Sequence, residues 1–207
     1  MAEKAVTIAR ANFGRATVTI RGTAPLVMHK FSAKAREAIL EKQTAGSTAN
    51  KGKKRSARDL EAEVQASIHR STDGWVGIPA GAFRAAMISA CRLVGFKMTI
   101  AKLSVFVEAD GYDQDDSTPL VKLVAGAPIV HETMGRLETG VCCPIVRPMW
   151  HEWRVNLRLK WDADQFTLSD LCNLLDRAGH QVGLLEGRPD SRKSAGMGWG
   201  TFAIVME

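Results

Sequence analysis

The clearest pattern in the chain is a strict alternation of apolar and polar residues between residues 152 and 161. The apolar positions are Trp153, Val155, Leu157, Leu159 and Trp161. A period of two residues predicts a β-strand that buries one face and leaves the other in water, as is typical of an antiparallel sheet. The intervening positions include three cations, Arg154, Arg158 and Lys160. This cationic face is either a binding surface or simply the solvated side of the sheet.

Weaker extended patterns lie elsewhere in the chain. Residues 16–21 alternate in the same way, within a segment predicted to be extended from residue 4 to residue 22. Short apolar runs bounded by turn residues predict further strands at residues 75–79, 102–108, 119–124 and 201–205. Residues 126–142 have no clear period and are predicted to form a long loop or a loose hairpin that carries His131, Arg136 and Cys142.

Apolar residues with a helical period predict helices at residues 33–43, 59–71, 80–94 and 167–178. Ser32 is expected to cap the first helix, Thr167 and Asp170 match a capping box, and Gly179 is expected to end the last helix. The third helix is expected to bury Ala82, Phe83, Ala86, Met87, Ala90, Cys91 and Val94. The fourth is expected to bury Leu168, Leu171, Cys172, Leu174 and Leu175.

The order of these elements indicates the fold class. The second half holds a long strand, a crossover helix and a final strand, and the first half repeats this unit around an inserted segment. Two such units predict an α+β fold, a modified ferredoxin-like antiparallel sheet with helices on one face, which RNA-recognition modules also use. At 207 residues the chain is expected to form one domain.

Composition narrows the class of protein. The hydrophobic fraction of 45% is that of an ordinary globular protein, and no apolar run is long enough to span a membrane. The first ten residues lack the apolar core of a signal peptide, so we expect a cytoplasmic protein without a membrane partner. Neither cysteines nor histidines show metal-ligand spacing, so we expect no metal and no cofactor. They are Cys91, Cys142, Cys143, Cys172, His29, His69, His131, His151 and His180.

The chain carries a formal net charge of +6, and part of it is concentrated in one segment. Residues 43–58 are small, polar and basic, and they contain no acid. The cations of this insertion are Lys51, Lys53, Lys54, Arg55 and Arg58. Such a segment cannot bury enough apolar surface to order itself. It is either a solvated loop or, as we favour, a flexible basic finger that becomes ordered on a polyanion.

A glycine-rich segment precedes the last strand. It contains three cations followed by alternating glycines around one tryptophan, namely Arg188, Arg192, Lys193, Gly196, Gly198, Trp199 and Gly200. Glycines expose backbone N–H groups that can form an anion-binding nest, and an aromatic ring offers a stacking surface for an unpaired base. The segment therefore indicates either a site for single-stranded nucleic acid or a surface loop that only shapes a turn.

Two stretches together resemble a known family. The stretch GIPAGAFRAA at residues 77–86, which includes Arg84, resembles the helix-entry motif of the RAMP superfamily, the repeat-associated proteins of CRISPR systems. The stretch RKSAGMGWGTF at residues 192–202 resembles the C-terminal glycine-rich loop of that superfamily. The resemblance implies a modified ferredoxin-like domain that binds single-stranded RNA. It also implies subunits that stack as a filament along the strand and a protruding thumb or finger that splays bases.

These observations favour a binding protein over an enzyme. The leading hypothesis is a protein that coats single-stranded RNA or DNA, RNA in preference, as a helical multimer, encoded by a CRISPR locus, a phage or a mobile element. The competing hypothesis is a metal-independent, guide-processing endoribonuclease that uses His29 as a general acid or base. The loop after the first strand has no carboxylate, which argues against metal-assisted cleavage. An assembly protein whose basic loop binds a protein partner is a third alternative.

Overall fold

The structure is a computed structural model that describes residues 8–31, 59–136, 142–191 and 195–205. Within the first gap it also describes Glu37, Leu40, Glu41 and Thr44, all of which are helical, in agreement with the helix predicted at residues 33–43. The basic insertion predicted at residues 43–58 lies outside the described residues, apart from Thr44. Ser32, the expected helix cap, also lies outside them.

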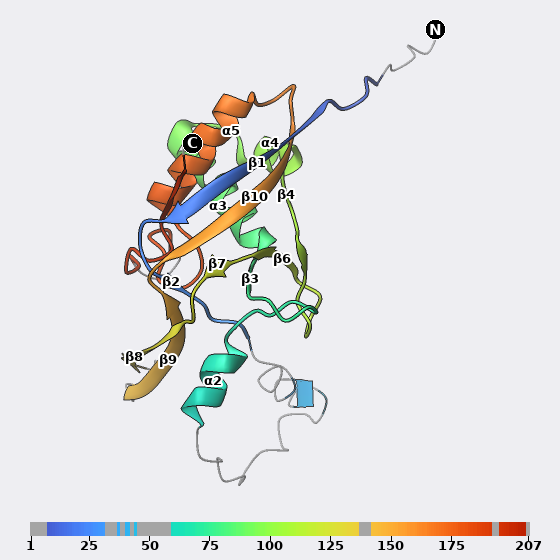
Figure 1. The fold of residues 1–207 in the computed structure, drawn as a ribbon. Coiled ribbons are helices and arrows are strands. Elements are labelled where there is room, and N and C mark those ends of the chain that lie inside the picture. Colours follow the sequence, from blue (N-terminus) through green and yellow to red (C-terminus); the bar gives the residue numbers. More distant parts are fainter. Residues whose placement is uncertain are drawn as a thin grey trace, which may run out of the picture.

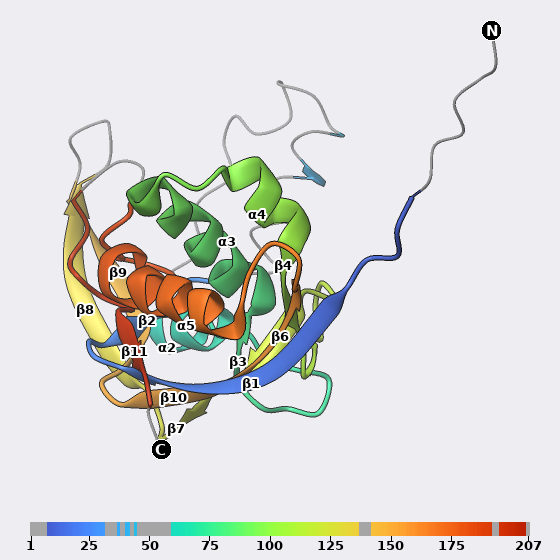
Figure 2. The same cartoon turned by 90° about the horizontal axis from the view of Figure 1, so that it is seen from above.

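The centre of the fold is a twisted antiparallel sheet (Figures 1 and 2). Its two long strands, β1 (Phe13–Gly22) and β10 (Trp153–Asp162), pair along their whole length. The outer strands are β11 (Phe202–Ile204), beside β1, and β4 (Val105–Glu108), beside β10. The strand order is therefore β11-β1-β10-β4, with the short β7 (Val124–Ala125) also paired to β10. This order places the fourth strand of two β-α-β units beside the first, which confirms the predicted α+β ferredoxin-like fold.

The alternation in β10 is also confirmed. Val155, Leu157 and Leu159 are buried in a core that includes Val18 and Ile20 of β1. Only one face of the sheet is buried because the helices lie on one side of β1 and β10 (Figure 2). These helices are α3 (Ala80–Ala90), α4 (Met98–Ser104) and α5 (Leu168–Arg177). The cationic positions of both strands face the other side.

Two helices follow their sequence signals at the N-terminus and depart from them further on. Helix α3 begins directly after Pro79 and continues as the short 3-10 helix η1 (Cys91–Val94). Helix α5 has the predicted Thr167 capping box. Helix α5 ends at Arg177 with Ala178 as its C-cap, so Gly179 follows the cap as predicted. Gly179 does not have the left-handed backbone expected there, and the chain continues through a wide turn, η2 (Ala178–Val182), as far as Gly183. Gly179 instead lies against β11, where a β-carbon would come within 2.1 Å of the Phe202 carbonyl oxygen.

The burial of two predicted core positions is also wrong. Val94 and Leu168 are 48% and 46% exposed. Val94 is the last residue of η1 and Leu168 the first residue of α5, so both stand at the ends of their helical segments.

Residues 98–104 form helix α4 and not the start of a strand, so β4 begins only at Val105. The reason is a tertiary contact. Arg84 of α3 donates hydrogen bonds to the carbonyl oxygens of Lys102 and Val105, at the point where α4 ends. The last carbonyls of a helix have no partner within the helix, and a side chain from elsewhere can satisfy them.

The segment predicted as a long loop or loose hairpin is a long regular hairpin. Strand β8 (Ile129–Arg136) pairs with β9 (Cys142–Trp150), and the short β2 (Leu26–Val27) pairs with the far edge of β9. Figure 1 shows this hairpin projecting from the body, away from α3 and α5. Pro144 and Pro148 lack the N–H group that strands normally use, so the sequence of β9 does not read as a strand.

A third small sheet completes the fold on the side of the insertion. It consists of β3 (Gly77–Pro79), β6 (Pro119–Lys122) and β5 (Gly111–Tyr112). Helix α2 (Leu60–Ala66) begins at its cap Asp59 as predicted and stops five residues earlier than the predicted end at residue 71. There the chain leaves the helix to reach β3, with its backbone bonded to that of Lys30 through the Ser67 carbonyl oxygen, 3.0 Å away.

Candidate nucleic-acid interface

The segment 183–200 folds back on itself and is fastened to β2. The Leu184 N–H donates to the Gly200 carbonyl oxygen at 3.0 Å, and the Met197 N–H donates to that of Gly187 at 2.7 Å. The Gly200 N–H donates to the Pro25 carbonyl oxygen at 2.7 Å, just before β2. The described part of the glycine-rich segment is thus a layer of defined backbone and not a loose flap.

The three predicted glycines all have a left-handed backbone, and their surroundings differ. A β-carbon at Gly196 or Gly200 would lie 2.1 Å from the carbonyl oxygen of Arg188 or Leu184. These two glycines are therefore required by contacts within the chain. At Gly198, with φ of 75°, a β-carbon would meet nothing within 4 Å. Of the three, Gly198 is the one whose bare backbone faces open space, where another molecule can approach.

Trp199 lies between the glycine-rich segment and the β8–β9 hairpin. Its ring covers Gly187, where a β-carbon would lie 2.4 Å from the Trp199 Cε3 atom. The ring of His131, on β8, meets it edge to face with the centroids 5.2 Å apart. The Trp199 side chain is partly buried, so it holds the two elements together and still presents part of its ring to solvent.

On its other side the segment faces helix α3 across a groove of about 460 Å³. Ala82, Ala85 and Ile88 form one wall, and Leu185 and Arg188 belong to the other. At one end of the groove Asp190 accepts hydrogen bonds from Ser89 and Arg92 of the helical wall. The Ser89 hydroxyl, followed by Arg92, lowers the pKa of Asp190, so its carboxylate stays ionised and links the two walls.

Arg188, a predicted phosphate ligand, lines this groove. Its guanidinium donates to the Leu185 carbonyl oxygen at 2.9 Å, which uses one of its five donors and orients the others. Arg84 is placed differently. Its guanidinium caps α4 and lies over the Phe106 ring, 5.3 Å from the centroid, so it turns toward β4 and not into the groove.

His29 belongs to a cluster on the hairpin side of the glycine-rich segment. The Arg147 Nε atom donates to Glu186 Oε2 at 2.7 Å. The His29 Nδ1 atom lies 3.3 Å from Arg147 Nη2 and 3.5 Å from Glu186 Oε2. Partial burial and the adjacent Arg147 charge both lower the pKa of His29, so its imidazole is neutral at pH 7. The side chain remains 45% exposed and open to a reactant.

The sequence analysis missed the partners of His29. Arg147 stands in a strand hidden by two prolines, and Glu186 stands in a loop without periodic pattern. Nothing in the spacing of these residues relates them to His29, and only the pairing of β2 with β9 brings them together.

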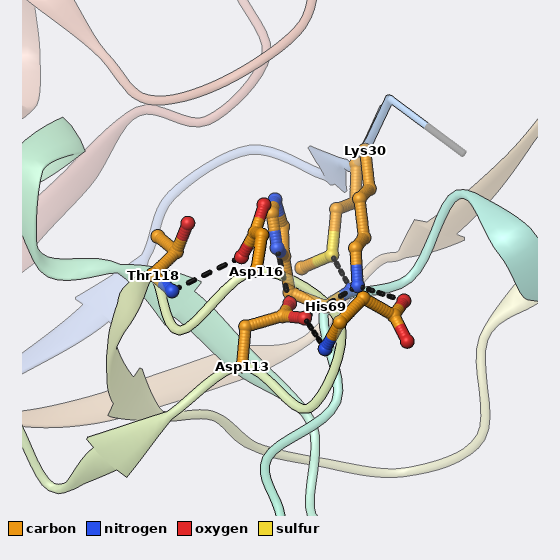
Figure 3. A network of polar contacts seen from close by, with 7 residues as sticks. Lys30, His69, Asp113, Asp116 and Thr118 are labelled. Atoms are coloured by element: carbon orange, nitrogen blue, oxygen red, sulfur yellow. Dashed lines mark hydrogen bonds and ion pairs between the residues drawn. The ribbon is translucent and has the colours of Figure 1, made fainter. Parts of the chain in front are cut away.

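A buried charge network lies beside His29 (Figure 3). The Lys30 Nζ atom contacts Asp113 Oδ1 and Asp115 Oδ2, each at 2.6 Å, and His69 Nδ1 lies 2.8 Å from Asp113 Oδ2. Burial alone would raise the pKa of Asp113, but its hydrogen bonds, chiefly from Lys30, outweigh burial and lower it. Burial would lower the pKa of Lys30, and the two carboxylates outweigh it and raise the pKa. Lys30 and Asp113 are thus both charged.

This network joins two parts of the chain that flank residues 32–58. Lys30 precedes these residues and His69 follows α2, and both are bound to the loop between β5 and β6. The sequence shows an acidic turn at residues 110–116, but nothing in it identifies the lysine that forms ion pairs with this turn.

The structure therefore brings some predicted site residues together and leaves others untested. Arg188, Gly196, Gly198 and Trp199 lie in one partly exposed layer, in which Arg188 faces the groove and Trp199 faces the hairpin, on the side of His29. Gly200 is buried within this layer, and Arg84 lies apart. Seven predicted cations lie outside the described residues, namely Lys51, Lys53, Lys54, Arg55, Arg58, Arg192 and Lys193.

Two further features of the described residues concern metal binding and membrane insertion. There, no group of three or more histidine, cysteine, aspartate or glutamate residues is arranged to hold a metal ion. No helix of that part of the chain has both the length and the apolar character needed to cross a bilayer.

Comparison with known proteins adds no relative to this picture. No model of a known protein family matches the chain, and no curated protein matches it.

Proposed function

We propose that this protein binds single-stranded nucleic acid, RNA in preference to DNA, and coats the strand as a multimer. One observation carries the proposal. The two stretches that resemble RAMP motifs are far apart in the sequence, yet both contact the same segment, residues 183–190. Helix α3 of the first stretch faces Leu184, Leu185 and Arg188 across the groove. In the second stretch, Gly200 is hydrogen-bonded to Leu184, and Met197 and Trp199 are hydrogen-bonded to Gly187.

The chemistry of this surface suits a sugar-phosphate backbone. Gly198 leaves its backbone open to close approach, and Arg188 offers donors from the groove. Trp199 presents part of its ring on the hairpin side of the same segment, where an unpaired base can stack. Arg192 and Lys193 belong to the same segment by sequence and add two charges for phosphate groups.

Self-association follows from the resemblance and from one further feature. The β8–β9 hairpin carries apolar side chains that are largely exposed, namely Ile129, Val130 and Met134. Apolar groups gathered on a projecting element are typical of a protein–protein contact. A second copy that covers the hairpin would repeat the nucleic-acid surface along the strand.

The direct test is a binding titration of the purified protein. Fluorescence anisotropy with labelled single-stranded RNA, single-stranded DNA and duplex DNA, at several salt concentrations, should give the tightest binding to RNA and the weakest to the duplex. Sedimentation should show several copies on a long strand. Equal affinity for duplex and single strands would indicate unspecific attraction by charge, and no binding at low salt would refute the proposal.

A second candidate function is metal-independent RNA cleavage at His29. The cluster favours it, because a neutral imidazole can accept a proton and Arg147 beside it can stabilise the charge that develops on phosphorus. Labelled RNA incubated with protein and a chelator should then be cut, with a rate that rises with pH through a pKa below 6.5. His29→Ala should abolish the cut, whereas His180→Ala, at an exposed histidine paired with Asp176, should not. RNA that stays intact after long incubation would refute cleavage and leave nucleic-acid binding as the remaining function.

A further inference from the structure

The face of the main sheet that the helices leave open carries an unusual distribution of charge. On β1 and β10 the solvent-facing positions form five facing pairs, which are Phe13 with Asp162, Arg15 with Lys160, Thr17 with Arg158, Thr19 with Asn156, and Arg21 with Arg154. Five of these ten residues are cations and one is an acid. Figure 2 shows α3, α4 and α5 on the opposite side of the two strands.

Three of the five cations have partners within the protein. Arg15 pairs with Glu108 at 3.2 Å, and Arg158 pairs with Asp110 at 2.9 Å. Lys160 lies over the Phe13 ring, 4.4 Å from its centroid. Their presence on the surface is explained by these contacts.

Arg21 and Arg154 have no such partner among the residues that the structure describes. They stand directly opposite each other in the strand pairing, and both are exposed. Directly opposed residues of an antiparallel pair have β-carbons about 4.5–5.5 Å apart, and like charges there destabilise the sheet. The two opposed guanidinium groups repel each other, and an anion bound between them would remove this repulsion.

The same two arginines line a hollow of about 270 Å³, whose remaining wall is the end of the chain at Ala203, Ile204 and Val205. Ala203 faces Arg21 across the pairing of β11 with β1. Its small side chain leaves the space above the strand open. The hollow is therefore lined by two guanidinium groups, which together carry ten N–H donors, and such donors suit the oxygens of a phosphate group.

This hollow is close to the glycine-rich segment along the chain. Ala203 follows Gly200 by three residues, and β11 is the edge strand of the sheet. The glycine-rich segment therefore leads directly into β11, the edge strand beside which the open face of β1 and β10 begins.

We propose that Arg21 and Arg154 bind a backbone phosphate of the single-stranded nucleic acid, so that the interface continues from the glycine-rich segment around β11 onto the open face of the sheet. The proposal rests on the proposed function. It adds a phosphate subsite that neither of the RAMP-like stretches contains.

The test compares two double variants with the same loss of charge. Arg21→Gln with Arg154→Gln removes the unpaired cations, and Arg15→Gln with Arg158→Gln removes two paired cations from the same strands and the same face. Binding to a labelled single-stranded RNA is measured by anisotropy at several salt concentrations. The first variant should bind about tenfold to a hundredfold more weakly, with a slope of log affinity against log salt reduced by about 0.7–1.4. The control should change both values much less.

Thermal unfolding of the same proteins separates binding from folding. Relief of the repulsion should raise the Tm of the Arg21, Arg154 variant by about 1–3 °C, whereas a structural role for these arginines would lower it. A titration with inorganic phosphate alone tests the other source of this ligand chemistry. Phosphate that binds the wild type as tightly as a strand does would make this a site for the free ion and overturn the proposal.

The possible outcomes keep this proposal apart from the proposed function. If wild-type protein binds RNA and the two double variants lose affinity equally, or neither loses any, the phosphate subsite is wrong and the binding function stands. If wild-type protein binds no single strand, the function itself fails and the subsite fails with it.

Discussion

The glycines of the glycine-rich segment are required for different reasons, although they share a left-handed backbone conformation. Gly196 and Gly200 are needed because a carbonyl oxygen of the same segment occupies the place of a side chain. Gly198 is needed only for its positive φ and leaves space beside it. The two kinds of glycine can therefore be distinguished by substitution.

Gly200→Ala should destabilise the protein by about 2–5 kcal/mol, because it combines left-handed strain with a steric clash against the Leu184 carbonyl oxygen. Gly198→Ala should cost only the strain, about 1–2 kcal/mol. Urea unfolding of both variants measures the difference. Gly198→Val should still fold and should bind single strands more weakly, because its side chain occupies the open approach. Equal loss of stability at the two positions, or unchanged binding by Gly198→Val, would contradict this assignment.

Trp199→Ala tests the ring that joins the segment to the hairpin. Since the side chain is partly buried against Gly187 and His131, we expect some loss of stability. If the exposed part of the ring stacks on bases, affinity should also fall by about 1–3 kcal/mol, with little dependence on sequence. Unfolding and anisotropy on the same variant separate the two effects. Lost stability with unchanged affinity would make Trp199 a purely structural residue.

At the scale of elements, contacts between distant parts of the chain hold the β8–β9 hairpin and the residues on either side of the insertion. The β8–β9 hairpin is joined to the body by β2 along one strand edge and by the Trp199 contact on its surface. Lys30, which precedes the insertion, and His69, which follows α2, are both bound to Asp113. The hairpin projects from the body and borders the proposed interface.

Lys30→Met should destabilise the protein by about 3–5 kcal/mol, because it leaves the Asp113 carboxylate buried without its cation. A matched control is Arg15→Met at the exposed pair with Glu108, where the expected loss is at most about 1 kcal/mol. Chemical unfolding of the two variants measures the contrast. Similar small losses in both would show that the buried network contributes little.

The network also sets a pH window. The folded pKa of Asp113 is lowered, so its contribution is present above the ordinary value of 3.8 and is lost as the pH falls through the folded pKa. The folded pKa of Lys30 is raised, so its contribution is present below 10.5 and is lost as the pH rises through the folded pKa. The contribution of the network to wild-type stability should therefore be present in full between about pH 4 and 10 and shrink outside this range. In Lys30→Met the buried Asp113 carboxylate has lost its cation and is relieved by protonation, so the stability difference between the two proteins should decrease as the pH falls. A difference that increases as the pH falls below 7 would contradict this account.

At the scale of the whole molecule, charge and fold are divided between regions. The helix-covered half of the sheet holds the core, while the basic insertion, the glycine-rich segment and the open sheet face carry most of the cations assigned to binding. Stability and nucleic-acid affinity should therefore respond to different deletions.

Removal of residues 46–58 should leave the Tm nearly unchanged, because the chain on either side is held by Lys30 and Ser67. It should weaken binding and reduce the slope of log affinity against log salt by as much as about 3.5, since up to five cations leave the interface. Replacing the same residues with an uncharged linker of equal length controls for the change in length. An unchanged slope would show that the insertion does not reach the nucleic acid.

The local patterns of the sequence were sufficient for much of this fold. Alternation along residues 153–161 requires one wet face and one buried face, and the Thr167 capping box begins its helix, because both depend on neighbours within a few residues. They were insufficient for α4, whose end is capped by Arg84, and for β9, whose two prolines mask its pairing. The partners of His29, the acceptors of Lys30 and the facing of Arg21 with Arg154 join residues distant in sequence. These contacts exist only once the strands have found their register, which is a property of the packed chain and not of any segment.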